Sequence, residues 1–156
     1  MQTNEKIVEV LNDLIEINND RVTGYEKAIE ETKDLDVDLR AIFQSMANDS
    51  RKYAAELTQD VNRFGGEATT DTTTSGKIYR AWMDVKATFT SHDRQSVLES
   101  CEFGEDAAQK AYNAALASDA EMSAEIRQLI TSQQATLRIA HDLIKKYRDL
   151  HHAINA

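Results

Sequence analysis

Proline is absent from all 156 residues of this chain, and that absence limits the fold more than any other feature of the sequence. Proline interrupts helices, and glycine, the other common helix breaker, occurs only five times. Few positions remain at which one strand could turn into the next. The sequence therefore predicts an all-α protein, and its length fits one domain over residues 1–156 that needs neither disulfides nor a structural metal.

Apolar residues recur at intervals of three and four along four long stretches, as they do in helices that bury one face. Gly65 and Gly66 can end the second stretch with a left-handed cap, and Ser118 and Asp119 are candidate N-caps for the fourth. The predicted long helices cover roughly residues 3–34, 37–64, 94–117 and the stretch after Asp119 to about residue 152.

A polar run rich in threonine separates the two halves of the chain, at about residues 66–76. It predicts an exposed, mobile crossover. A short amphipathic stretch at about residues 77–88 follows, and we expect it to form a helix that places Trp82 over one end of the bundle. The predicted architecture is a four-helix bundle whose long crossover carries one short extra helix.

The charge and the cysteine content indicate which partners and which cellular compartment to expect. Lys and Arg total 18 against 27 Asp and Glu, and the net charge of -9 repels phosphate backbones and anionic lipids, so neither nucleic acid nor a membrane is an expected partner. No long apolar stretch resembles a signal peptide or a membrane span. Cys101 is the only cysteine, so an internal disulfide is excluded and a reducing, cytoplasmic location fits best.

The two halves of the chain resemble each other. Residues 18–25, followed by Ala28 and Ile29, match residues 105–112, followed by Ala115 and Leu116. Such a repeat suggests two related helical hairpins joined by a long crossover, which is the ferritin-like form of the four-helix bundle.

A ferritin-like di-iron site requires a glutamate from each of two helices and a Glu-x-x-His pair from each of the other two. The repeat places Asn18 and Glu105 at the single-glutamate positions, and Ser50 and Tyr53 stand where the second helix would carry its pair. On the fourth helix the pair falls at Gln134 and Leu137, or at Gln133 and Thr136 in a register shifted by one residue.

Glu105 is therefore the one carboxylate at these positions, which lack histidine in either register. Because carboxylates both bind the iron ions and neutralise their charge, we expect no di-iron centre, no other metal and no cofactor. The positions instead predict a buried polar layer that fixes the helix register through hydrogen bonds. Its predicted members are Asn18, Tyr25, Ser50, Tyr53, Glu105, Tyr112 and Gln134.

Several segments resemble a bacterial ferritin-like family of unknown function, domain of unknown function 2383. They are residues 80–86 around Trp82, residues 98–107 with their Gly-Glu-Asp, and Tyr112 followed by Ala115 and Leu116, while residues 11–14 and 140–142 fit the ends of the family pattern. The resemblance implies the ferritin-like fold for nearly the whole chain. It implies little about function beyond a loose association with stress responses.

Two further residues have plain structural interpretations. His141 lies beside the stripe of the fourth helix, where a lone histidine is more often packed or hydrogen-bonded than catalytic. Cys101 lies on an apolar face beside Glu99 and Glu102, which would not activate a thiolate.

We accordingly expect a non-enzymatic interaction or stress-associated protein that forms a symmetric homodimer through its helix faces. Two alternatives stay open. One is a degenerate metal protein in which Glu105, Tyr25, Tyr53 and Gln134 hold a single ion. The other is a binder of a small apolar ligand inside the bundle.

Overall fold

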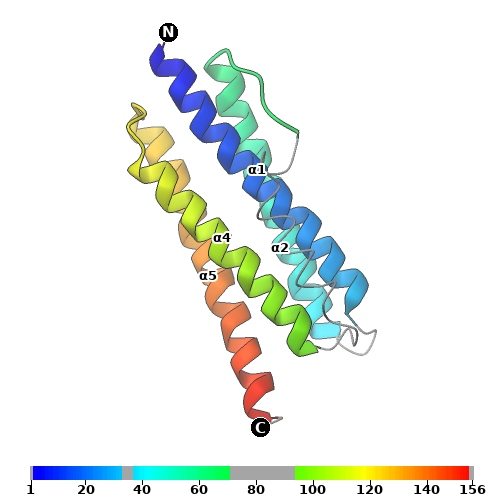
Figure 1. Cartoon of the computed structure of the whole chain (residues 1–156). Coiled ribbons are helices and arrows are strands. Elements are labelled where there is room, and N and C mark those ends of the chain that lie inside the picture. Colours follow the sequence, from blue (N-terminus) through cyan, green and yellow to red (C-terminus); the bar gives the residue numbers. More distant parts are fainter. Residues whose placement is uncertain (1, 33–36, 71–93, 155–156) are drawn as a thin grey trace.

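A computed structural model describes residues 2–32, 37–70 and 94–154 (Figure 1). Four long helices account for nearly all of them, and these ranges contain no strand. The helices are α1 (Gln2–Glu31), α2 (Val37–Arg63), α4 (Arg94–Ala117) and α5 (Ala124–Ile154). The all-α prediction is confirmed. The predicted short helix with Trp82, and the crossover beyond residue 70, lie outside the described residues.

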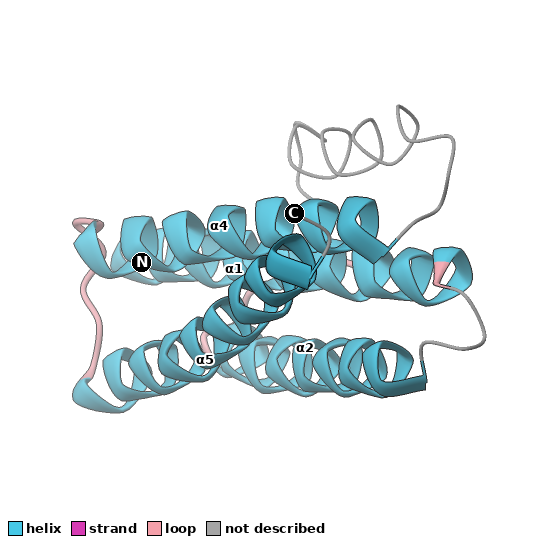
Figure 2. Ribbon diagram, turned by 90° about the horizontal axis from the view of Figure 1, so that it is seen from below, coloured by secondary structure: helices cyan, strands magenta, loops and turns pink. Residues whose placement is uncertain are grey.

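The helices pair in the order of the chain. Helix α1 packs against α2, α4 packs against α5, and the two hairpins meet chiefly where α1 contacts α4 (Figure 1). Helix α5 runs obliquely to the other three, and its backbone does not pair closely with α2 (Figure 2). No helix in the described ranges combines the length and the apolar character needed to cross a membrane.

The apolar core consists of two clusters at opposite ends of the bundle. One cluster takes residues 7–17 of α1 and the C-terminal half of α2, and the other begins at Tyr25 of α1 and includes Phe43 of α2. Buried polar side chains of all four helices meet between the two clusters, namely Asn18 and Arg21 of α1, Ser50 of α2, Glu105 of α4 and Gln133 of α5. The polar layer thus lies at mid-height, where water has no access.

The end of α2 shows why two glycines follow it. The backbone N–H of Gly65 donates to the carbonyl of Asn62 at 3.0 Å, and that of Gly66 donates to the carbonyl of Val61 at 3.0 Å. This Schellman cap requires a residue with positive φ, and Gly65 has a φ of 78°. A Cβ on Gly66 would lie 2.6 Å from Cγ1 of Val8, so glycine also permits the close approach to α1.

The start of the crossover is bonded to α1. The side-chain amide of Asn12 donates to the carbonyl of Glu67 at 3.0 Å, and its oxygen accepts from the N–H of Thr69 at 3.0 Å. One α1 side chain therefore holds residues 67–69 through their backbone, an interaction that local sequence composition does not reveal.

The start of α5 was predicted too early. Ser118 donates to the carbonyl of Ala115 at 2.8 Å and so closes α4, while Asp119 forms an exposed ion pair with Lys6 at 2.8 Å. The hydroxyl of Ser123 accepts from the N–H of Ile126 at 3.2 Å, which makes Ser123 the N-cap. The first turn of the predicted helix is therefore an irregular connection.

Candidate functional site

The polar layer begins with three side chains on one face of α1. Asn18, Arg21 and Tyr25 follow each other at intervals of three and four residues, so they point the same way, and their exposed fractions are 0%, 1% and 0%. A fully buried arginine is rare because its charge must be paired away from water. The residue that pairs with Arg21 therefore determines the charge of the layer.

That partner is Glu105 of α4, which is also completely buried. Nε and Nη2 of Arg21 lie 2.8 Å and 2.6 Å from Oε1 of Glu105, and the hydroxyl of Tyr25 donates to the same oxygen at 2.7 Å. The second carboxylate oxygen, Oε2, has no hydrogen-bond partner among the described residues. The charges of Arg21 and Glu105 thus neutralise each other inside the bundle.

The environment favours the protonation states that this pairing requires. Burial alone would lower the pKa of Arg21, but the adjacent Glu105 carboxylate raises it overall. Burial and the same carboxylate raise the pKa of Tyr25 well above its ordinary value. Arg21 therefore stays charged, and Tyr25 stays protonated and donates a hydrogen bond to Glu105.

A chain of hydrogen bonds leads from this ion pair to the other helices. Nη1 of Arg21 donates to the hydroxyl of Ser50 on α2, and that hydroxyl donates to Oδ1 of Asn18 at 3.0 Å. The amide of Asn18 donates to the hydroxyl of Tyr112 at 2.9 Å, which donates to Oε1 of Gln133 on α5 at 2.6 Å. Each hydroxyl both accepts and donates, so the chain is internally consistent.

Gln133 ends the chain at the α2 side of the bundle. Its amide nitrogen lies 3.5 Å from the carbonyl of Tyr53 and 3.3 Å from Oε1 of Glu56, which is half-exposed. All four described helices therefore contribute to one connected layer. Tyr53 contributes its backbone carbonyl to these bonds, and its ring packs in the adjacent apolar cluster.

The placement of Gln134 in the layer is wrong. Gln133 is 2% exposed, whereas Gln134 is only half-buried and donates to Oδ1 of Asn113 at 2.5 Å near the surface. One residue along a helix rotates the side chain by about 100°, so only one of the two glutamines can face the layer. The alternative register places Gln133 correctly, but its second member, Thr136, is exposed.

Burial also sets the state of the remaining tyrosines. It raises the pKa of Tyr112, against a smaller lowering by the hydrogen bond from Asn18, and it raises the pKa of Tyr53. Both phenols therefore stay protonated at neutral pH. They act as hydrogen-bonding groups and not as anionic ligands.

Arg21, the central cation of the layer, was not among the residues predicted from the sequence. It lies three residues after Asn18 and four before Tyr25, so helical spacing places it on the same face, but its neighbour Val22, which is only half-buried, fits the apolar spacing between Asn18 and Tyr25 equally well. The available signal was Glu105 itself, because a buried carboxylate requires a positive partner. Asp20, which precedes Arg21 in the sequence, is also fully buried.

Metal ligands are sparse around the layer. Within residues 2–32, 37–70 and 94–154, no three His, Cys, Asp or Glu side chains gather as a ligand set, and Oε1 of Glu105 is already bonded to Arg21 and Tyr25. The guanidinium supplies the positive charge that a metal would bring. The set predicted for a single ion is not assembled in this structure, because Gln134 lies near the surface and donates to Asn113.

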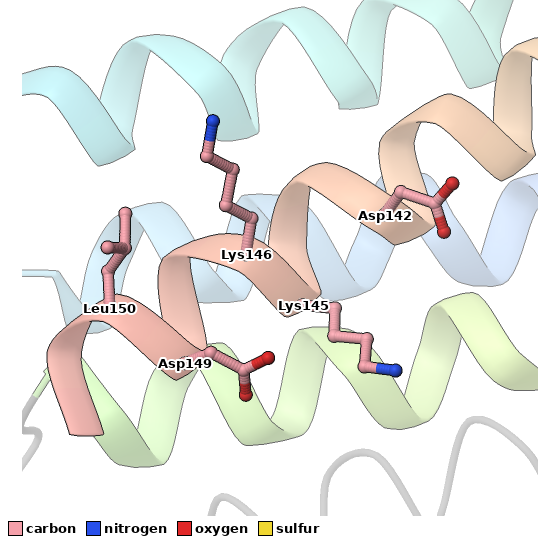
Figure 3. Close-up of a pocket in the computed structure, with 5 residues that line it drawn as sticks. All are labelled: Asp142, Lys145, Lys146, Asp149 and Leu150. Carbon is pink, nitrogen blue, oxygen red and sulfur yellow. The ribbon is translucent and has the colours of Figure 1, made fainter. Parts of the chain in front are cut away.

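Two shallow pockets lie on outer surfaces of the bundle. One runs along the C-terminal half of α5, where charged side chains and Leu150 stand on successive turns (Figure 3). The other lies on α4 beside Phe103 and Lys110. Neither is lined by a member of the polar layer.

These features define a class of protein, an all-α bundle of two helical hairpins whose interior is organised by an ion pair and a hydrogen-bonded layer. The chain belongs to the family described as Domain of unknown function (DUF2383), whose model matches residues 6–118. The matched range holds every member of the layer except Gln133. A comparison with curated proteins finds no match.

Proposed function

We propose that this protein is a non-enzymatic, ferritin-like helical interaction protein in which the Arg21–Glu105 ion pair takes the place of a metal centre. One observation carries the proposal, namely that the only interior carboxylate predicted for a metal site is bonded to a buried guanidinium at 2.6 to 2.8 Å. The carboxylate is thereby neutralised without a metal ion.

The protonation states and hydrogen bonds of the layer's side chains also argue against catalysis within it. Chemistry at neutral pH needs a group that can exchange protons or bind a reacting atom, usually in a cleft. In this layer burial keeps Tyr25 and Tyr112 protonated, and Arg21 is held by Glu105 and Ser50. The layer therefore supports a role in holding the helices in register.

Contacts with other molecules would then be made by the outer helix faces. Ile139 and Leu150 on α5 and Phe103 on α4 are exposed by 69%, 51% and 41%, and these large apolar side chains are candidates for contacts with a partner. A homodimer through such faces, a cytoplasmic location and an association with stress responses remain predictions from the sequence.

Elemental analysis tests the proposal. Protein purified from cells grown with added iron, manganese and zinc should contain far less than one metal ion per chain, because no ligand set surrounds Glu105. An Arg21→Gln variant tests the reason, since removing the guanidinium should leave the metal content unchanged or raise it slightly. Two metal ions per wild-type chain, with oxidase activity, would overturn the proposal.

A further inference from the structure

A second cluster of titratable groups joins α4 to α5, outside the polar layer. Nε2 of His141 lies 2.5 Å from Oδ1 of Asp106 on α4, and Nδ1 of His141 lies 3.3 Å from Oδ1 of Asp142 on its own helix. The imidazole is partly buried, with 21% of its side chain exposed, and the two carboxylates are more open. One imidazole therefore stands between two carboxylates.

This geometry specifies a protonation state. Carboxylates at neutral pH only accept hydrogen bonds, and a neutral imidazole has one N–H, so it can satisfy only one of the two aspartates and turns a lone pair toward the other. The imidazolium has two N–H groups and satisfies both. We propose that His141, protonated between Asp106 and Asp142, is a pH-dependent clasp that fastens the C-terminal half of α5 to α4.

The C-terminal half of α5 makes few packing contacts, so the clasp contributes noticeably to its attachment. Helix α5 pairs closely with α4 and not with α2, and beyond His141 only Ile144 is fully buried among the described side chains. A further polar tie to α4 in this region is the ion pair between Arg148 and Glu102. Loss of the imidazolium charge would weaken the tie to Asp106, because a neutral imidazole keeps at most one hydrogen bond and loses the ionic attraction to both carboxylates.

The charged surroundings favour the protonated imidazole. Burial alone would lower the pKa of His141, but the hydrogen bonds to Asp106 and Asp142 raise it overall from 6.5. Lys110 on α4 and Lys145 on α5 stand one turn from Asp106 and from His141 respectively, and both are exposed, so solvent screens their opposing charges.

The raised pKa of His141 determines how the stability contributed by the clasp depends on pH. A histidine whose pKa is higher in the folded than in the unfolded state contributes stability that is fully present below the unfolded pKa of 6.5. The contribution is lost as the pH rises through the folded-state pKa. The clasp is therefore at full strength below pH 6.5 and weakens as the pH rises through the folded-state pKa, which lies above 6.5.

An NMR titration of the imidazole carbons tests the protonation state. The His141 signal, assigned by its absence in His141→Gln, should titrate above pH 6.5 in the wild type. In Asp106→Asn it should titrate closer to 6.5, and Asp142→Asn should have a smaller effect because that contact is longer and more exposed. Asp49→Asn on α2 is a matched control and should leave the titration unchanged.

Hydrogen exchange tests the fastening. After correction for intrinsic rates, amides of residues 142–150 in the wild type should exchange several-fold faster above the His141 titration than below it, and those of His141→Gln should exchange fast throughout. The inference is overturned if His141 titrates at or below 6.5. It is equally overturned if exchange of these amides does not follow the titration.

Discussion

Glu105 is a fully buried carboxylate that is bonded to two side chains of α1. Its carboxylate is 0% exposed, and one of its oxygens accepts hydrogen bonds from both Arg21 and Tyr25. Moving a carboxylate and a guanidinium out of water is costly, and their attraction offsets that cost only while both are present. Removal of either partner leaves an uncompensated buried charge.

Glu105→Ala should accordingly lower the free energy of unfolding by about 3 to 5 kcal/mol, the usual cost of breaking a buried pair from one side. Glu105→Gln should cost less, because it keeps the shape and one acceptor for Tyr25. Glu30→Ala is the control, since Glu30 is exposed on α1, and it should stay within about 0.5 kcal/mol of the parent. Urea denaturation measures all three. An unfolding free energy for Glu105→Ala equal to that of the parent would contradict the burial of this carboxylate.

Individual residues of the layer could be predicted where a polar side chain interrupts an apolar stripe. Asn18, Ser50 and Glu105 stand out in this way, and all three are buried. Arg21 could not be found by the same criterion, because arginine usually extends to solvent and Val22 beside it satisfied the apolar pattern. The partner of a buried charge depends on which helices face each other, which periodicity alone does not specify.

At the level of the helix, α5 shows how a ligand pattern can mislead. Gln134 lies three residues before Leu137, the spacing of a Glu-x-x-His pair, and was placed in the layer for that reason. The apolar spacing of Ile126, Ile130 and Leu137 instead puts Gln133 on the buried stripe, where it accepts from Tyr112 on α4. Helix type and the buried stripe were predictable, whereas the polar partner of Gln133 required the packed structure.

The two glutamines form a matched pair of variants. Gln133→Ala should cost about 1 to 3 kcal/mol, because Tyr112 loses its acceptor in the core and a buried group is left unpaired. Gln134→Ala removes a contact at the surface and should cost no more than about 0.5 kcal/mol. Thermal melts of the two variants show directly which of them is less stable. The reverse order would mean that α5 is rotated relative to the arrangement described here.

For the whole molecule, the layer joins two halves that contact each other over a limited area. The hairpins α1–α2 and α4–α5 meet mainly along α1 and α4, and the hydrogen bonds from Arg21 and Tyr25 to Glu105 and from Asn18 to Tyr112 all cross that junction. The internal sequence repeat predicted the two hairpins. It did not predict that an ion pair connects them, because only one half carries the arginine.

A double-mutant cycle between Arg21 and Glu105 tests most directly whether this ion pair organises the bundle. Arg21→Met and Glu105→Leu should each destabilise the protein by about 3 to 5 kcal/mol, because each leaves one buried charge unpaired. The double variant removes both charges of the pair, so its loss in unfolding free energy should be smaller than the sum of the two by about 3 kcal/mol. Losses that add to within about 0.5 kcal/mol would show that the two side chains act independently, and would contradict the account.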